Sequence, residues 1–231
     1  MRLKHLFIFV PLLLCANAFS QQDKLFFNRA HFFEHEDCQH PIGMVLNNNV
    51  YYSNNSDTNA FMHFNNLEDE IVYVNLINFG KYTIFDMELM KTQIVNKALF
   101  KLNTSEYPPS TDASLKEVER KFELKQVKDS IVDDKTLKHI QIIPKDTLAH
   151  SFESYNLLID ASIDTETPLY SAPEAFFLLK KNLPDMTGTV VETFFIDLQG
   201  NRFCRDVLSG YEATNKRVIV NRLYSLIEPN Y

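Results

Sequence analysis

The stretch from Leu183 to Ser209 constrains the fold more than any other part of the sequence. Apolar residues alternate with other residues on both sides of Gly200-Asn201, at Val190, Phe194, Ile196, Leu198, Phe203 and Val207. Such alternation around a two-residue turn is typical of a β-hairpin. With Gly200-Asn201 as the turn, Leu198 faces Phe203, Ile196 faces Arg205, and Phe194 faces Val207. We therefore expect Phe194 on the buried face, and Phe195, Asp197 and Cys204 on a half-polar face that needs only partial cover.

Short segments with strand-like composition fill most of the remaining chain. Before residue 104 they are Val50–Ser53, Ala60–Phe64, Ile71–Ile77, Lys81–Phe85 and Gln93–Leu102. After it they are Phe122–Val127, Leu137–Ile142 and Ser151–Ala161. Closely spaced strands without β-α-β alternation predict a mainly antiparallel sheet and exclude the doubly wound nucleotide-binding folds.

Helices are predicted at few places. Ser171 and Glu174 form a capping box in front of a helix over Ala175–Lys181. Ile219, Leu223, Leu226 and Ile227 recur at helical spacing, which favours a helix over Asn215–Ile227, although its valines and isoleucines leave a strand as the competitor. Lys24–His40 fits a short helix or an irregular docking segment. The fold class is thus α+β, with residues 21–231 as one β-rich domain and a proline-containing linker at residues 104–113.

The first 20 residues have the parts of a secretory signal peptide. Arg2, Lys4 and His5 precede an apolar run over Leu6–Cys15, and Ala16-Asn17-Ala18 offers a cleavage site. The run of 10 residues is too short to cross a bilayer, which needs about 20. We expect an exported protein, periplasmic or secreted, without a transmembrane helix in the mature chain. Cleavage as a lipoprotein at Cys15 stays open.

Charge and motifs narrow the function classes. Without Arg2 and Lys4, 21 basic residues face 30 acidic ones, a net charge of −9 that argues against nucleic acids and anionic membrane surfaces as partners. The sequence contains no G-x-S-x-G, Walker A, H-E-x-x-H or G-x-G-x-x-G motif. We therefore predict a protein that is not an enzyme and needs no cofactor.

One cluster could still bind a metal. His31, His35, Cys38 and His40 lie close together among acidic residues, and imidazole with thiolate suits zinc or copper if His31 and His35 share a helix face. The alternative is an acidic surface segment whose cysteine is in a disulfide. After signal cleavage only Cys38 and Cys204 remain, so in an oxidising compartment a bond between them is the simplest expectation.

The second half resembles a known family. The segments from Lys121 to Asp146, SYNLLID from Ser154 and NLPDMTGTVVETFFIDLQGNRF from Asn182 resemble the GLPGLI-type and related exported β-rich proteins of Bacteroidota, and Leu183-Pro184 matches the family's motif. The resemblance covers about Lys121 to Ser209. It implies a strongly curved antiparallel sheet or half-barrel with short helices packed on one side, and it supplies no catalytic residues.

These observations lead to three functional hypotheses. The first is a non-enzymatic cell-envelope protein that binds an apolar ligand or a protein partner on its curved sheet. The second is a metal-binding protein that uses the cluster from His31 to His40, and the third is a structural or assembly module. The pair Tyr51-Tyr52 places one ring on each face of a strand, so one ring needs cover from a groove, a ligand, a partner or a helix.

Overall fold

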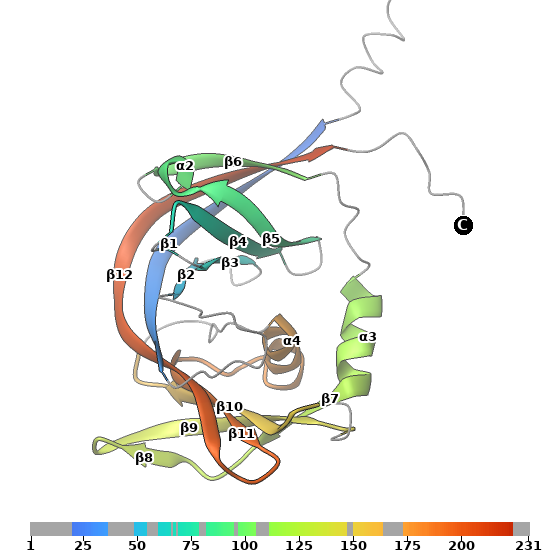
Figure 1. Ribbon diagram of the computed structural model, residues 1–231, viewed down its shortest axis with the longest axis vertical. Helices are drawn as coiled ribbons and strands as arrows, with labels where there is room; N and C mark the ends of the chain where they lie inside the picture. The colour runs from blue at the N-terminus through green and yellow to red at the C-terminus, as the bar shows by residue number, and fades with distance from the viewer. Residues whose placement is uncertain are drawn as a thin grey trace, which may run out of the picture.

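A computed structural model describes residues 20–36, 49–54, 60–65, 67, 69–78, 82–94, 97–104, 111–146, 150–163 and 173–223. Its strands form one strongly curved, open sheet, in which all the strand pairs but one are antiparallel (Figure 1). The order is β5-β4-β3-β2-β1-β12-β11-β10-β9-β7, with β6 also on β12 and β8 on β9. The strands are β1 (Ser20–Glu36), β2 (Asn49–Ser53), β3 (Ala60–Asn65), β4 (Ile71–Asn78), β5 (Tyr82–Met90), β6 (Leu99–Thr104), β7 (Phe122–Gln126), β8 (Ser130–Val132), β9 (Lys135–Pro144), β10 (Phe152–Asp160), β11 (Thr189–Asp197) and β12 (Arg202–Leu223).

Two long strands, β1 and β12, hold the sheet together. They pair from Ser20 opposite Leu223 to Glu36 opposite Arg205, and they form the curved back of the molecule in Figure 1. The helix predicted over Asn215–Ile227 is therefore wrong as far as Leu223, and the competing strand is correct. Val218 and Val220 are fully buried, whereas Arg217 is exposed and Ile219 is half-buried, so the alternation of a strand outweighs the helical spacing.

The upper part of the sheet curls around a first core. Strands β1 to β5, β12 and β6, with the short helix α2 (Lys91–Ile94), surround a cluster that includes Phe27, Met62, Phe64, Leu76 and Val220. This curl is the expected half-barrel. The strand predicted over Gln93–Leu102 begins only at Leu99, because α2 occupies the residues up to Ile94.

The lower part carries a second core on the opposite face of the sheet. Helix α4 (Pro173–Asn182) packs Ala175, Phe177, Leu178 and Leu179 against β9, β10 and β11. Phe61 and Ile77 of β3 and β4 join this second core, whereas their neighbours Met62 and Leu76 belong to the first. The middle strands are thus buried on both faces. The predicted helix over Ala175–Lys181 is confirmed, and the predicted fold class is correct.

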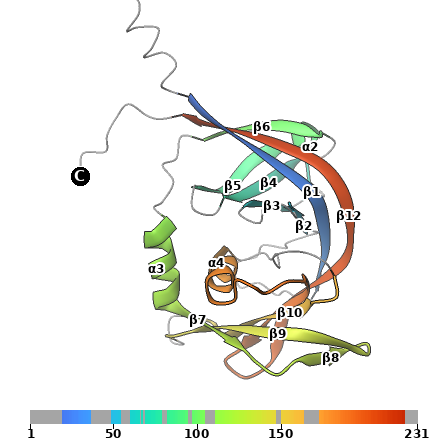
Figure 2. The same cartoon turned by 180° about the vertical axis from the view of Figure 1, so that it is seen from behind.

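The helices fill or flank the hollow of the curve. Figures 1 and 2 show α4 inside the curve and α3 (Thr111–Lys121) across its open side. Sequence reasoning missed α3, which begins within the proposed linker at 104–113; residues 105–110 are outside the described part. No helix among the described residues is long and apolar enough to span a bilayer. The predicted signal segment up to residue 19 also lies outside the described residues.

The central hairpin exists, but its predicted register is wrong. Asp197 N donates to Asn201 O, Gly200 N donates to Asp197 O, and Gly200 adopts a φ of 83°. The connection is therefore a three-residue loop, Leu198 to Gly200, with glycine at the left-handed position. The Asp197 carboxylate accepts hydrogen bonds from the backbone N–H of Gln199 and Asn201, which fixes this longer loop.

The new register changes which side chains share a face. Ile196 pairs with Arg202, and an irregularity at Cys204, whose φ is 47°, brings Arg205 opposite Phe194. Leu198 lies in the loop and is 52% exposed, so it is not part of the core. Phe195 packs against the second core, while Phe194 joins a small cluster with Leu137 and Leu158 on the other face. Both faces of the hairpin are therefore covered.

Candidate functional site

A row of polar and aromatic side chains crosses five adjacent strands. Backbone pairing places side by side Tyr211 of β12, His31 of β1, Tyr51 of β2, His63 of β3 and Asn75 of β4. Directly paired residues point to the same face of a sheet. That face is the one that carries the second core, because Phe61 lies two residues before His63 on β3. We call these five residues the histidine row.

The centre of the row is buried and closely packed. His31 and Tyr51 are each 2% exposed, and His63 is 6% exposed. The rings of Tyr51 and His63 are stacked, with centroids 4.1 Å apart and planes 3° from parallel. Phe33 meets Tyr51 edge-on at 5.2 Å, and Nε2 of His31 lies 3.3 Å from Oγ of Ser53. These contacts fix the ring orientations and make a preformed aromatic surface.

Several buried polar atoms around the row have no hydrogen-bond partner. Among the described residues, Nε2 of His63, Oδ1 of Asn49 and Oδ1 of Asn65 meet no partner. Asn49 and Tyr51 alternate on β2, and His63 and Asn65 alternate on β3, so all four share the face of the row. Each unsatisfied buried group costs about 1–3 kcal/mol. A cluster of such groups on one face indicates a place where a polar ligand group or bound water is accommodated.

Burial also keeps the two histidines of the row neutral. Desolvation lowers the pKa of His63 to about 3. The same effect, with a smaller contribution from the charge of Arg29, lowers the pKa of His31 to about 4. At neutral pH both rings therefore present one N–H donor and one unprotonated nitrogen, which suits hydrogen bonding with an uncharged polar group.

A second polar group lies where the upper and lower parts of the sheet meet. Nδ1 of His35 lies 2.5 Å from Oδ1 of Asp206, and Oγ1 of Thr193 donates to the other oxygen of Asp206 at 3.4 Å. The carboxylate thus orients the imidazole. Nε2 of His35 is buried and meets no hydroxyl or thiol partner in the described chain, so the pair does not form a nucleophile–base arrangement there.

The structure does not bring the described members of the proposed metal set together. The segment expected as a helix is strand β1, so His31 and His35 lie about 13 Å apart along it. His31 is engaged with Ser53 and His35 with Asp206. Among the described residues, no three His, Cys, Asp or Glu side chains are grouped so that they could hold a metal ion. Cys38 and His40 lie outside the described residues.

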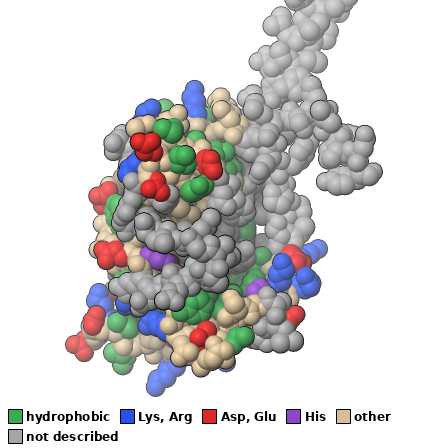
Figure 3. Space-filling view, in the orientation of Figure 1, with side chains coloured by type: hydrophobic (Ala, Val, Ile, Leu, Met, Phe, Trp, Pro, Cys, Tyr) green, Lys and Arg blue, Asp and Glu red, His purple; other side chains and the backbone are tan. Residues whose placement is uncertain are grey.

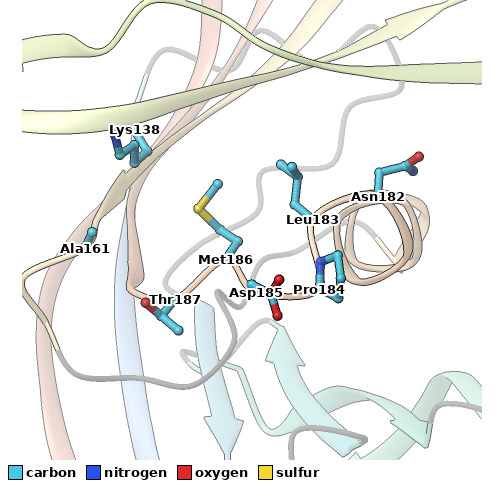
Figure 4. Close-up of a pocket in the computed structure, with 8 residues that line it drawn as sticks. All are labelled: Lys138, Ala161, Asn182, Leu183, Pro184, Asp185, Met186 and Thr187. Atoms are coloured by element: carbon cyan, nitrogen blue, oxygen red, sulfur yellow. The ribbon is translucent and has the colours of Figure 1, made fainter.

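The Leu-Pro turn that carries the family resemblance borders an open pocket of about 390 Å³. Figure 4 shows Leu183 and Met186 of this turn pointing to the same side, with Lys138 projecting from β9. Gly188 anchors the end of the turn, since its φ is 128° and a Cβ there would lie 2.7 Å from the carbonyl oxygen of Asp160. Apart from Lys138 and Asp185, its lining offers no charged group, so it is the weaker candidate site.

The sequence contained part of the signal for the histidine row. The expectation that Tyr51 and Tyr52 face opposite sides of a strand is confirmed, because Tyr52 lies in the first core and Tyr51 on the other face. His63 was missed because it is a lone polar residue in a predicted strand, and Asn49 was missed because it ends a run of three asparagines that is typical of a turn. Histidine side chains are visible between the upper and lower parts of the molecule in Figure 3.

Comparisons with known proteins give distant likenesses. No family model matches the chain, and no curated protein matches it. A chain of the MucA/MucB complex of Pseudomonas aeruginosa is 12% identical at a TM-score of 0.40, covering 84% of this chain and 52% of that one. A structure of MucB is 11% identical at a TM-score of 0.38, covering 80% and 53%. A structure described as an outer membrane lipoprotein-sorting protein domain from Vibrio parahaemolyticus is 8% identical at a TM-score of 0.24, covering 90% and 88%.

The chain therefore spans about half the length of the MucB chains that it resembles. With TM-scores of 0.40 or less, these structures indicate neither a ligand nor a partner nor an activity for this chain. The resemblance to GLPGLI-type proteins stays a prediction.

Proposed function

We propose that this chain is an exported, non-enzymatic cell-envelope protein that binds an apolar ligand bearing an uncharged polar group. The polar group would lie on the histidine row, and the apolar part would lie along the second core beside Phe61 and Ile77. The observation that carries the proposal is the set of buried polar atoms at His63, Asn49 and Asn65, which meet no partner among the described residues, beside a stacked aromatic pair.

The chemistry of the site favours binding over catalysis. The two histidines of the row have pKa values of about 3 and 4, far below the range in which a histidine exchanges protons at neutral pH. The described neighbours of the row supply rings, amides, the Ser53 hydroxyl and the guanidinium of Arg29, groups that can orient a ligand by hydrogen bonding and packing. A protein partner would bury a side chain in the same place, and is the other outcome of the test below.

The test is native mass spectrometry of the protein purified from the envelope without detergent. We expect a stoichiometric amphipathic species that organic solvent releases. His63→Leu should lose it, whereas Leu198→Ser, on the exposed hairpin loop, should retain it. Wild-type protein that carries no such species and gains none from an envelope lipid extract would contradict the proposal. A co-purified polypeptide that His63→Leu loses would replace the ligand with a partner.

We also propose the disulfide between Cys38 and Cys204. Glu36, the last residue of β1, pairs with Arg205, which is next to Cys204, and Cys38 follows Glu36 by two residues. Two residues reach at most about 7 Å, so this pairing would allow Cys38 to approach Cys204 closely enough for a disulfide. Export behind the signal peptide at residues 1–20 would supply the oxidising compartment.

A further inference from the structure

The outer face of three adjacent strands forms a regular grid of side chains, which are exposed except for the half-buried Ile219 and Asn221. Each β12 residue of the grid pairs with β1 on one side and with β6 on the other. The first line of the grid is Lys24, Ile219 and Lys101; the second is Phe26, Arg217 and Leu99; and the third is Gln22, Asn221 and Asn103. The alternate residues of the same strands, such as Phe27, Val218 and Phe100, lie in the first core. The grid therefore faces away from that core.

The charge of the grid is opposite to that of the chain. It contains Lys24, Lys101 and Arg217 and no acidic residue, whereas the whole sequence has a net charge of −7. Lys24 and Lys101 make no ion pair with any described residue. Arg217 lies over the ring of Phe26 at 5.9 Å, and its Nε reaches Oδ1 of Asn215 at 3.4 Å. No internal carboxylate in the described part of the chain neutralises these cations.

Apolar side chains are exposed between the cations. Phe26 is 41% exposed and Leu99 is 50% exposed, on either side of Arg217. A hollow of about 270 Å³ opens beside Leu99 and Lys101 and is also lined by Leu89 and Lys97. Lysine and arginine around an aromatic ring and a leucine match the boundary between phosphate headgroups and acyl chains, because cations bind the phosphates while Phe and Leu enter the boundary.

We infer that this grid docks the protein on the surface of a bilayer that contains anionic phospholipid. The local charge outweighs the chain's overall acidity, because at physiological ionic strength charges more than about 8 Å away are largely screened. The site is separate from the histidine row, so this inference stands or falls independently of the proposed ligand.

Vesicle flotation tests the inference. We expect the purified exported protein to float with vesicles of phosphatidylcholine and phosphatidylglycerol in a 70:30 ratio, and not with phosphatidylcholine alone. Each basic residue near such a surface contributes about fivefold in binding, so the triple variant Lys24→Gln, Lys101→Gln, Arg217→Gln should bind roughly 100-fold more weakly. Phe26→Ser with Leu99→Ser should also weaken binding, but less.

The matched control removes three lysines elsewhere. Lys116, Lys125 and Lys128 are exposed, and their substitution by Gln changes the net charge equally. This control should float like the wild type, with circular dichroism showing that all variants are folded. An equal loss of vesicle binding in the control and grid variants would overturn the inference. Wild-type protein that does not float with anionic vesicles would overturn it as well. Binding to soluble polyglutamate but not to vesicles would overturn it in favour of an acidic protein partner.

Discussion

Two rows of side chains on the same face of the sheet differ in what they bury. The histidine row crosses the upper part through His31, Tyr51 and His63. The second row crosses the lower part, beyond the pair Phe33 and Leu208, and it runs through His35, Asp206, Thr193, Leu157 and Ile140. Near β1, Nδ1 of His35 and Oγ1 of Thr193 both reach the carboxylate of Asp206, and the one polar atom of this row left buried without a described partner is Nε2 of His35. The apolar members of this row belong to the second core with α4. In and beside the histidine row, by contrast, His63, Asn49 and Asn65 on the adjacent strands β2 and β3 each bury a polar atom that meets no partner among the described residues.

The difference separates stability from binding. Where α4 packs, the sheet presents Leu157 and Ile140, both fully buried, as a face that needs only a helix to cover it. In the histidine row the chain keeps costly polar groups at positions where apolar residues would pack better. Sites that trade stability in this way are typical of functional positions. Under the proposed function, the lower row therefore serves stability and the upper one serves binding.

The largest expected effect comes from the bond proposed at the junction of the two regions. A Cys38–Cys204 disulfide closes a loop of more than 160 residues, so reduction should lower the free energy of unfolding by up to about 5 kcal/mol. Urea unfolding with and without reductant measures the loss. Intact mass after alkylation without reductant should show no added groups, whereas two alkylated cysteines would disprove the bond and reopen the metal hypothesis for Cys38.

Acid should weaken the upper row selectively. The folded pKa values of His31 and His63 lie below the unfolded value of 6.5, so the unfolded chain binds more protons as the pH falls. The free energy of unfolding is therefore unaffected by protonation of these two groups above pH 6.5. Below it the free energy of unfolding declines, by about 2 kcal/mol for each histidine at pH 5. Urea unfolding between pH 7.5 and 5 measures this slope. The double variant His31→Leu, His63→Leu should flatten it, and an unchanged slope in that variant would place the acid sensitivity elsewhere.

Truncation in the lower row should cost stability without affecting binding. Leu157 is fully buried against the second core, so Leu157→Ala should lower the free energy of unfolding by about 3 kcal/mol while ligand binding by the folded protein stays intact. Leu198→Ala is the control and should cost less than about 0.5 kcal/mol, because Leu198 lies in the exposed hairpin loop. Similar losses of unfolding free energy in the two variants would indicate that Leu198 is buried, as the hairpin register predicted from sequence requires.

The same contrast explains what could be predicted from sequence. Alternation located most strands, and the capping box of Ser171 and Glu174 located the helix at Ala175–Lys181, because both signals depend on residues close together in sequence. It failed at the hairpin, where the carboxylate of Asp197 selects a three-residue loop over the two-residue turn at Gly200-Asn201. It also failed at the C-terminal segment, where pairing of β12 with both β1 and β6 outweighs helical spacing.

The candidate site was harder to predict from the sequence than the fold. His31 was singled out from sequence, but with His35 and for metal binding, because neighbours in sequence were taken as neighbours in space. Its actual partners, Tyr51 and His63, come from other strands and follow from register alone. The charged grid was hidden for the same reason, since net charge averages over the chain whereas Lys24, Lys101 and Arg217 meet only in the folded sheet.

The smallest expected effect shows whether His63 serves the scaffold or ligand binding. His63→Leu replaces a buried imidazole, whose Nε2 has no hydrogen-bond partner in the described chain, with an apolar side chain of similar size. Relief of that unsatisfied group should outweigh the lost stacking on Tyr51, which contributes about 0.5–1.5 kcal/mol, and raise the free energy of unfolding by about 1 kcal/mol at pH 7.5. Urea unfolding of ligand-free protein measures this, since bound ligand would stabilise the wild type alone. His63→Gln, which keeps a polar group in place, should give no such gain. A loss of stability in His63→Leu would mean that His63 is part of the scaffold, and that the histidine row is not kept at a cost for binding.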